Sequence, residues 1–285
     1  MDGLSFTLGE GEAVGLLGAN GSGKTTSLRV IMGFTKADRG EVLFDSKLGP
    51  MGRDFRQNVG FLPERPYFYP DLTGRDFLCF MGALNGMSRK GIRKSIIEWS
   101  ERFKIDFALD SKIKIYSKGM LQRIGLCSAL LHNPKLLILD EPLSGLDPIG
   151  RKELKDAIRE VNRQGKTVFF STHIIQDVEE ICEKVIFIEK GKLLYEGAID
   201  KLMTSGESFY EFKISKRSVG KNFEWNGNTL ELEDFLIITV SGEDRLAFLK
   251  KLIDKEIDIE SIVPIRSSLE EIFYKVKNRE GRICL

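Results

Sequence analysis

The sequence lacks the features that place a chain in a membrane or outside the cell. No apolar run approaches the roughly 18 residues that a membrane-spanning helix needs. The opening residues Met1-Asp2-Gly3-Leu4 lack the basic and apolar regions of a signal peptide. The four cysteines are scattered and form no C-x-x-C pair, which is typical of thiols in a reducing compartment. We therefore expect a cytosolic chain, which reaches a membrane only by binding a partner that crosses it.

An excess of charge of one sign is also lacking. The 43 lysines and arginines nearly balance the 42 aspartates and glutamates, which leaves a net charge of +1. No bulk electrostatic field therefore draws this chain to nucleic acid, and we expect no nucleic-acid partner. Hydrophobic residues make up 42% of the 285 residues and charged residues 30%, which indicates a soluble globular protein with ample material for a core.

A length of 285 residues suggests one large domain or two unequal ones, and the character of the sequence changes after Gly206. We predict a first domain over residues 1–204 and a small α/β accessory module over residues 205–285. In that module the pattern predicts strands at 209–214, 230–240 and 259–263, a helix around 246–253 and a last helix after Ser268. No catalytic constellation is visible in the module.

The most informative stretch is GANGSGKTT, from Gly18 to Thr26. It follows the apolar run 13–17, precedes a segment with helical spacing, and fits the phosphate-binding pattern Gly-x4-Gly-Lys-[Ser/Thr]. Glycines let backbone N–H groups face an anion, and the N-terminus of the following helix adds further donors. The alternative, a flexible glycine turn with a surface lysine, does not explain the flanking strand and helix. We expect nucleotide phosphates to be bound by Gly18, Asn20, Gly21, Ser22, Gly23, Lys24, Thr25 and Thr26.

A second stretch, Leu136 to Glu141, places two carboxylates at the end of an aliphatic run. Four aliphatic residues without alternation predict a strand buried on both faces, and open α/β sheets bind ligands at the carboxyl ends of such strands. Acids that merely start a loop are the alternative. Given the first stretch, we expect Asp140 to hold Mg²⁺ together with the hydroxyl of Thr25, and Glu141 to polarise the attacking water.

Three further positions are candidates for the same chemistry. His173 ends a predicted strand at 167–170, where it can reach phosphate, although a lone histidine is usually structural. Asp147 and Pro148 predict a helix start, and capping and function can coexist at Asp147. Ser117 is a candidate N-cap of a helix that extends to Leu131.

Other segments predict the frame around these motifs. Residues 4–8 alternate like a strand, and residues 40–44 and 59–62 resemble short strands, whereas residues 73–103 look helical and charged. The segment Pro63–Pro70 is rich in proline and aromatic residues, so it is neither helix nor central strand. We weigh two roles for it evenly: a surface loop whose rings cover the core, and a docking surface.

Together these motifs resemble those of the ATP-binding subunits of ABC transporters, across about residues 1–200. The resemblance identifies Gly18–Thr26 as Walker A, Tyr116–Arg123 as the signature motif, Leu136–Glu141 as Walker B, Ser144–Asp147 as the D-loop and His173 as the switch histidine. It implies an α/β P-loop NTPase fold of the ABC ATPase class, with a RecA-like core and a helical subdomain at about residues 65–133. It further implies ATP hydrolysis to ADP and phosphate with Mg²⁺, in which Lys24, Glu141 and His173 are the catalytic residues.

Two departures from the usual motifs resemble the ABC-2 exporter group. The signature LSGGQ is here Tyr-Ser-Lys-Gly-Met, and Glu64 stands where a glutamine is usual. The resemblance implies a homodimer or heterodimer that sandwiches two ATP molecules, with Ser117, Gly119 and Asp147 contacting nucleotide across the interface. A carboxylate at Glu64 can bind Mg²⁺ or water. The loop Glu64–Tyr69 would pass motion to a polytopic ABC-2-type permease, which holds the ATPase at the inner face of the cell membrane.

Family members normally begin with a further strand, whose aromatic residue stacks on adenine, and this chain starts after it. We expect either a start further upstream or another group that holds the base, with Phe6 in the core and not a substitute. A soluble ABC-type ATPase that acts on ribosomes or nucleic acid is the alternative function. It is disfavoured by a single nucleotide domain, no long coiled-coil insertion and no basic excess. A P-loop kinase would leave Tyr116–Arg123 unexplained.

Overall fold

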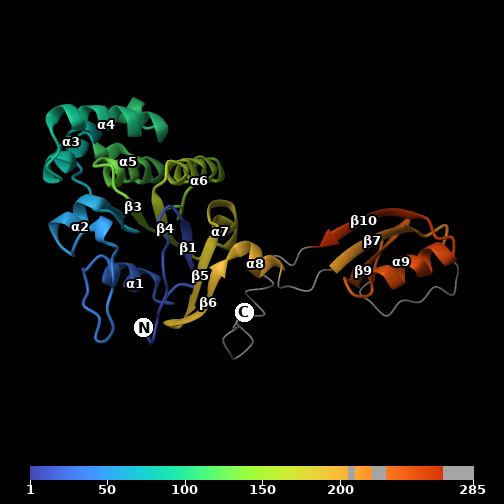
Figure 1. Ribbon diagram of the computed structural model, residues 1–285. Coiled ribbons are helices and arrows are strands. Elements are labelled where there is room, and N and C mark those ends of the chain that lie inside the picture. Colours follow the sequence, from blue (N-terminus) through green and yellow to red (C-terminus); the bar gives the residue numbers. More distant parts are fainter. Residues whose placement is uncertain (205–208, 220–228, 266–285) are drawn as a thin grey trace. The chain divides into compact units, whose positions relative to one another are not determined.

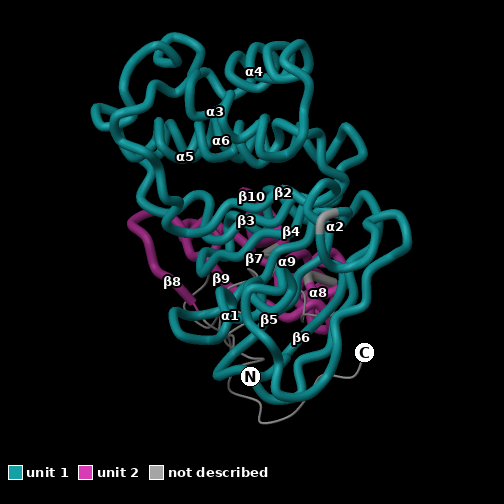
Figure 2. The backbone as a smooth tube through the Cα atoms, turned by 90° about the vertical axis from the view of Figure 1, so that its left-hand side faces the viewer, with its two compact units in different colours: residues 1–198, 281–285 teal, residues 199–280 magenta. Residues whose placement is uncertain are grey.

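A computed structural model describes residues 1–204, 209–219 and 229–265 (Figure 1). The chain divides into two compact units, the first built from residues 1–198 and the second starting at Ile199 (Figure 2). Each unit has its own hydrophobic core, and each is described by itself below.

The first unit is built around a six-stranded sheet in the order β2-β3-β4-β1-β5-β6, in which only β6 is antiparallel to its neighbour. Strands β1, β3 and β4 are buried along their whole length, which explains their continuous apolar runs. Because Leu17 pairs with Thr172 and Asp140 with Ser171, the carboxyl ends of β1, β3 and β4 meet at one edge of the sheet. The strands are β1 (Ala13–Leu17), β2 (Val59–Leu62), β3 (Leu136–Asp140), β4 (Thr167–Thr172), β5 (Lys184–Glu189) and β6 (Lys192–Ala198).

Helices cover both faces of this sheet. On one face α1 (Lys24–Ile31) buries Leu28 against Val14 and Phe169, with α2 (Arg53–Asn58) beside β2. On the other face α7 (Ile175–Ile181) lies so close to β1 that a Cβ on Gly15 would come within 2.9 Å of Val178. Helix α6 (Pro148–Arg163) contacts β4 and α7.

Three helices pack together next to β2: α3 (Gly74–Leu84), α4 (Arg89–Arg102) and α5 (Lys118–Leu130) (Figure 1). Each begins at a hydroxyl side chain that caps the helix by accepting a backbone N–H, namely Thr73, Ser88 and Ser117. Helix α5 lies directly on β2, since a Cβ on Gly60 would be 2.2 Å from the carbonyl oxygen of Ala129, and one on Gly125 would be 2.6 Å from Leu62. Short 3-10 turns span Ser46–Leu48, Asp106–Ala108 and Ile113–Ile115.

Two predicted strands of the first unit are wrong. Residues 4–8 and 40–44 form no strand, although the exposure of residues 4–8 does alternate. The alternation is correct about burial, because Leu4, Phe6 and Leu8 pack on the core. The backbone N–H of Thr7, however, donates to the carboxylate of Glu196 at 3.0 Å instead of to a neighbouring strand. Phe6 lies 5.8 Å from the ring of Phe169, which confirms that it belongs to the core.

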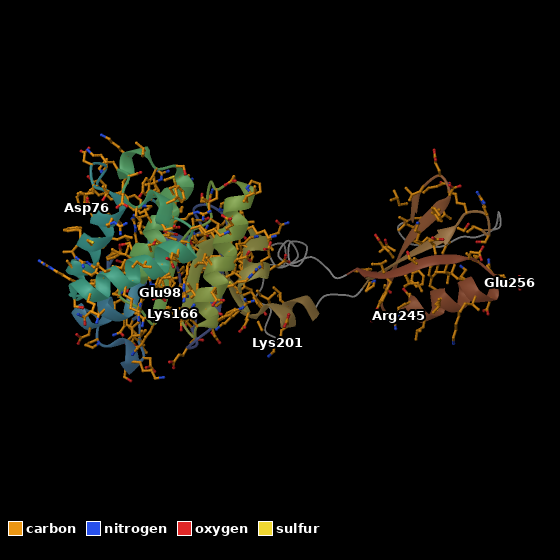
Figure 3. All side chains as sticks on the ribbon, turned by 90° about the horizontal axis from the view of Figure 1, so that it is seen from above. Asp76, Glu98, Lys166, Lys201, Arg245 and Glu256 are labelled. Atoms are coloured by element: carbon orange, nitrogen blue, oxygen red, sulfur yellow. The ribbon has the colours of Figure 1, made fainter. Side chains whose placement is uncertain are left out.

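The second unit contains a four-stranded antiparallel sheet in the order β10-β7-β9-β8, with one helix packed on it. Its core joins Phe212 and Ile238 of the sheet to Phe248 and Leu252 of the helix. Arg245, which is labelled in Figure 3, donates to the hydroxyl of Tyr210 at 2.6 Å. Its guanidinium also lies over the Tyr210 ring. The elements are α8 (Ile199–Thr204), β7 (Phe209–Ser215), β8 (Thr229–Glu231), β9 (Phe235–Ser241), α9 (Arg245–Asp254) and β10 (Ile259–Ile265).

One prediction for this unit needs correction. Residues 230–240 form two strands and not one, because the chain turns between β8 and β9, where the N–H of Leu232 donates to the carbonyl of Phe235 at 2.9 Å. The last helix predicted after Ser268 lies outside the described residues.

Candidate nucleotide site

The glycine-rich loop joins the end of β1 to the start of α1 with a backbone that suits an anion. Gly21 and Gly23 have φ angles of 80° and 107°, which favour glycine, and a Cβ on Gly18 would lie 2.4 Å from the carbonyl oxygen of Ile188. Gly23 takes the N-cap position of α1 without a capping side chain, so the first N–H groups of the helix are left for a ligand. The hydroxyl of Ser22 is buried and has no hydrogen-bond partner in the described part of the chain. An orphaned hydroxyl beside a helix N-terminus fits a phosphate.

Lys24 points into this loop. Its ammonium group donates to the carbonyl oxygens of Gly18 at 2.7 Å and Ala19 at 3.3 Å, and forms an ion pair with Glu141 at 3.2 Å. Only 5% of Lys24 is exposed. Because a buried cation needs compensating partners, these three oxygens hold the charge where a phosphate group can take their place.

Asp140 and Thr25 meet at the sheet edge. The hydroxyl of Thr25 lies 3.3 Å from Asp140 Oδ1, and the hydroxyl of Ser171 donates to the same oxygen at 2.6 Å. Mg²⁺ prefers oxygen ligands and is usually held by one or two carboxylates together with substrate phosphates, so Thr25 and Asp140 fit this ion. Among the described residues no group of three or more acidic, histidine or cysteine side chains could form a metal site by itself.

Glu141 connects two of the predicted catalytic side chains. One carboxylate oxygen contacts Lys24, and the other lies 3.0 Å from Nδ1 of His173. Its backbone has a φ of 47°, which is uncommon for a residue other than glycine, and its N–H donates to the Ser171 hydroxyl at 2.9 Å. The hydroxyl of Ser171 thus bonds to both acidic residues. Its role depends on the pairing of β3 with β4, which the sequence pattern does not reveal.

A second group of predicted residues gathers elsewhere on the first unit. Ser117 and Gly119 at the start of α5 line a depression of about 400 Å³ together with Asp147 at the start of α6. Within the described ranges, no hydrogen bond or ion pair joins these three residues to Lys24, Asp140 or Glu141. The predicted site residues therefore form two groups and not one.

The capping roles differ within this second group. The Ser117 hydroxyl accepts the N–H of Met120 at 3.3 Å, which confirms the predicted N-cap. Asp147 takes the N-cap position and Pro148 is the first helical residue, but the Asp147 carboxylate makes no capping hydrogen bond. It lies over Gly150 instead, where a Cβ would come within 2.7 Å of Oδ1. The predicted helix start at Asp147 and Pro148 is therefore confirmed, but the Asp147 carboxylate makes no capping hydrogen bond in it.

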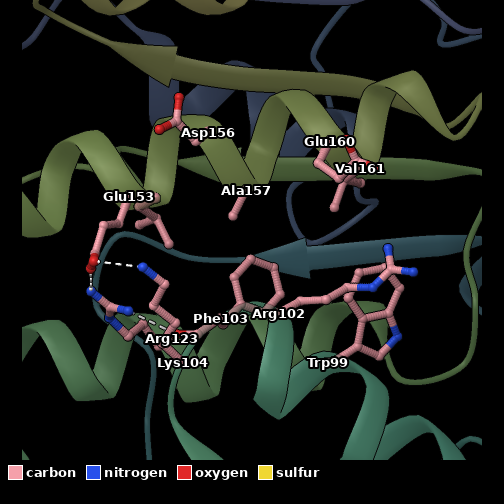
Figure 4. A pocket seen from close by; sticks show the side chains of 11 residues that line it. Trp99, Arg102, Phe103, Lys104, Arg123, Glu153, Asp156, Ala157, Glu160 and Val161 are labelled. Carbon is pink, nitrogen blue, oxygen red and sulfur yellow. Dashed lines mark hydrogen bonds and ion pairs between the residues drawn. The ribbon is translucent and has the colours of Figure 1, made fainter.

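An ion-pair network joins the two helices that carry the second group (Figure 4). Arg123 of α5 donates to Glu153 of α6 at 2.6 Å and to the carbonyl of Phe103 at 2.8 Å, while Lys104 bonds to the other Glu153 oxygen at 2.9 Å. The hydrogen bond from Arg123, and then that from Lys104, hold the pKa of the Glu153 carboxyl below its usual range. A cavity of about 230 Å³ adjoins the network, with Trp99 and Phe103 among its lining residues. The network thus joins α5, which starts after Ser117, to α6, which starts after Asp147.

Glu64 does not join either group. It follows β2 by two residues, at the same edge of the sheet as Asp140, but its side chain is exposed. In the described ranges no hydrogen bond or ion pair to it is formed.

Comparisons with known proteins agree with this geometry. The family model described as "ABC transporter" matches residues 1–144. The chain is 36% identical to the uncharacterized ABC transporter ATP-binding protein YdbJ of Bacillus subtilis, over 95% of this chain and 88% of that protein. It is 32% identical to the bacitracin transport ATP-binding protein BcrA of Bacillus licheniformis, over 97% of this chain and 92% of that protein. A protein of Synechocystis, sll0415, is 39% identical over 72% of this chain but only 58% of its own length.

Solved structures show the same fold. CbiO1 from Clostridium perfringens, part of an ABC transporter complex, matches with a TM-score of 0.63 and 28% identity, over 71% of this chain and 83% of that chain. The ATP-binding subunit of another ABC transporter gives a TM-score of 0.62 and 29% identity, over 70% of this chain and 84% of that chain. The predicted α/β P-loop ATPase fold is confirmed.

The fold and the glycine-rich loop define a P-loop nucleotide-binding protein. The motif order and the relatives then place it more closely: the chain belongs to the ABC transporter family, as one of its ATP-binding, ATP-hydrolysing proteins. In the described residues no helix is long and apolar enough to span a membrane.

Proposed function

We propose that this chain is the ATPase subunit of an ABC-2-type exporter, in which two such subunits close over two ATP molecules and drive a membrane permease. The observation that carries the proposal is the separation of the two groups. Lys24, Asp140 and Glu141 are buried at one sheet edge, whereas Ser117 and Gly119 lie at the surface, at the start of α5. A single nucleotide bound by the first group would meet the second group of another subunit.

We assign the chemistry as follows. When nucleotide binds, Lys24 breaks its contacts with the Gly18 carbonyl and with Glu141, and its ammonium group binds the terminal phosphates instead. Glu141, freed from Lys24 and held by His173, orients the attacking water and accepts its proton while the water oxygen bonds to the γ-phosphorus and the bridging oxygen leaves with ADP. Mg²⁺, held by Thr25 and Asp140, with Glu64 reaching it only through water, would neutralise charge on the phosphates.

The second group suits the dimer interface. The N-terminus of α5 presents Ser117 and Gly119 to solvent, and helix N-termini favour phosphate oxygens. Large apolar side chains here are left in water by a monomer: Phe107, which lines the depression, is 75% exposed, and Ile149, next in sequence to the lining residue Gly150, is 72% exposed. Covering them in a dimer would contribute to association at about 25 cal/mol per Å² of apolar area.

The segment after β2 suits a permease. Phe68 turns inward and contacts Phe77 at 5.2 Å, whereas Tyr67 and Tyr69 are exposed by 81% and 45%. Tyr69 bridges Tyr67 to Phe80 by two edge-to-face contacts of 5.7 Å each, which forms a continuous aromatic surface. The loop therefore covers the core with one ring, which is the first role weighed from the sequence, and its two exposed tyrosines support the second role, docking. We propose that this aromatic surface docks on the permease at the inner face of the membrane.

The proposal is tested by a tagged pull-down from detergent-solubilised membranes of the native host, followed by mass spectrometry. The wild-type chain should bring down a polytopic membrane protein in stoichiometric amount. The double variant Tyr67→Ser/Tyr69→Ser should lose that partner and still bind ATP, whereas Phe107→Ser, on the other proposed interface, should keep it. Ribosomal proteins or nucleic acid in place of a membrane protein would overturn the exporter and favour a soluble ABC-type ATPase.

We also propose that residues 1–204 act as the ATPase domain and residues 205–285 as an accessory module. The relative BcrA supports a shared module, because its match covers 97% of this chain.

A further inference from the structure

A buried ion pair lies behind His173, outside the two groups described above. The carboxylate of Asp177, in α7, is only 1% exposed and receives two hydrogen bonds from the guanidinium of Arg151, in α6. This bidentate arrangement is the strongest geometry that arginine and a carboxylate can form. The nucleotide-binding chemistry proposed above uses neither residue.

The same carboxylate is linked through the Thr172 side chain to the backbone N–H that follows His173. The Thr172 hydroxyl donates to Asp177 Oδ2 at 3.2 Å and accepts the N–H of Ile174 at 3.1 Å. Thr172 ends β4 and Ile174 precedes α7, so these two bonds orient the peptide groups that flank His173. The Thr172 hydroxyl therefore connects Asp177 to the segment that carries the imidazole beside Glu141.

Arg151 connects this arrangement to the exposed second group. Its backbone N–H donates to the carbonyl of Asp147 at 2.9 Å, in the first turn of α6. A displacement of Asp147 would move Arg151, and through Asp177 it would move the segment that carries His173.

We propose that Arg151 and Asp177 are positioning residues, which orient His173 against Glu141 and make that orientation depend on the position of Asp147. The inference rests on the proposed function for the catalytic role of His173. A dimer contact that displaces Asp147 would thereby change the orientation of His173 against Glu141 in the same subunit.

The chain contains a matched control for this proposal. Lys155 and Arg159 of α6 bond to Glu180 of α7, at 2.7 Å and 3.3 Å. These ion pairs join the same two helices as Arg151 and Asp177, but the Glu180 side chain is 45% exposed against 1% for Asp177, and among the described residues they have no bond to the His173 segment. Removal of Glu180 therefore tests the helix contact alone.

The test compares Asp177→Asn, Arg151→Lys and Glu180→Gln in the purified full-length chain. The sequence has only two histidines, so proton NMR of the imidazoles gives two sets of signals, and His132→Gln assigns the one that belongs to His173. We expect the His173 signals to shift in Asp177→Asn, to shift less in Arg151→Lys and to stay unchanged in Glu180→Gln. ATPase assays should show kcat lower by about tenfold in Asp177→Asn with KM for ATP unchanged, which is part of the 10²–10⁴ that acid–base groups contribute.

Unchanged His173 signals in a folded Asp177→Asn or Arg151→Lys variant would overturn the proposal, as would equal effects of Asp177→Asn and Glu180→Gln. The NMR signals do not depend on a transporter, so they separate this inference from the proposed function. Shifted signals with normal kcat would keep the positioning role and remove His173 from catalysis.

Discussion

The two groups of site residues differ in how their polar atoms are satisfied. Lys24, Asp140 and Glu141 are 2–8% exposed, and each finds its partners within its own chain. Ser117 and Asp147 lie at the surface, and the Asp147 carboxylate does not even cap its own helix. A buried charge needs a partner within the protein, whereas an exposed polar group is solvated by water and can later bind another molecule. Under the proposed function, one subunit would supply the buried part of each site and a second subunit would supply the exposed part.

The largest effect should come from Glu141→Gln. The amide keeps the shape but cannot accept the proton of the attacking water, so kcat should fall by about 10²–10⁴ while ATP binding is retained. Turnover by the purified protein and a nucleotide titration measure the two quantities. The exposed Glu183→Gln serves as control. Near-normal turnover in Glu141→Gln would remove Glu141 from its role.

Lys24→Ala should instead weaken nucleotide binding itself. A charge-assisted hydrogen bond contributes up to about 3 kcal/mol, which corresponds to about 100-fold in Kd. Titration with a fluorescent ATP analogue measures the change. Lys47→Ala removes an exposed ion pair with Glu10 and should leave Kd unaltered. If both variants bound ATP equally well, the loop would not be a phosphate site.

Ser117→Ala probes the exposed group, in a Glu141→Gln background that holds ATP. The variant loses one hydrogen bond to phosphate per site, so ATP-dependent dimerisation should weaken by about tenfold or more. Ser88→Ala is the matched control, because Ser88 caps α4 as Ser117 caps α5. Each change should lower stability by about 1 kcal/mol. Size-exclusion chromatography with ATP separates the two, and equal dimer loss would place Ser117 outside the interface.

Glu64→Gln tests whether the first group extends to β2. We expect ATPase activity to stay within a few-fold of wild type, roughly 1 kcal/mol of barrier, because Glu64 is exposed and an amide oxygen can still bind water. Steady-state ATPase assays at saturating Mg²⁺ measure it. A hundredfold loss would show that the negative charge is essential and that Glu64 acts together with Lys24, Asp140 and Glu141.

The smallest effect concerns the ion pairs that Glu153 forms with Arg123 and Lys104, next to Ser117 and Asp147. Arg123 and Lys104 lower the pKa of Glu153 in the folded state, so the unfolded state binds more protons at acidic pH. The stabilisation is fully present above the ordinary carboxyl pKa of 4.5 and is lost as pH falls through the lower folded value. Urea unfolding from pH 7 to pH 3 should show a smaller acid loss in Glu153→Gln than in wild type. Parallel curves would contradict this.

Local patterns were sufficient for the glycine loop, the buried strands and the cap at Ser117, because each depends on neighbours in the sequence. The failures needed non-local information. Residues 4–8 alternate correctly in burial, yet a strand also needs a backbone partner, and Thr7 bonds to a side chain. The bonds of Ser171 to Asp140 and Glu141 depend on the register of β3 against β4, which periodicity cannot give.

The absence of two methyl groups determines how closely helix α5 follows strand β2. Because Gly60 and Gly125 carry no Cβ, the helix rests on the strand, and Gly125 also faces Phe68 between the two exposed tyrosines. Close-packed contacts transmit displacement and do not absorb it. A displacement of Tyr67 or Tyr69 would therefore displace α5, the helix that starts after Ser117. A Gly60→Ala substitution would force α5 away from β2, because the new Cβ would clash with the carbonyl oxygen of Ala129. The exposed tyrosines and Ser117 would be unchanged, but the close packing that connects them would be lost.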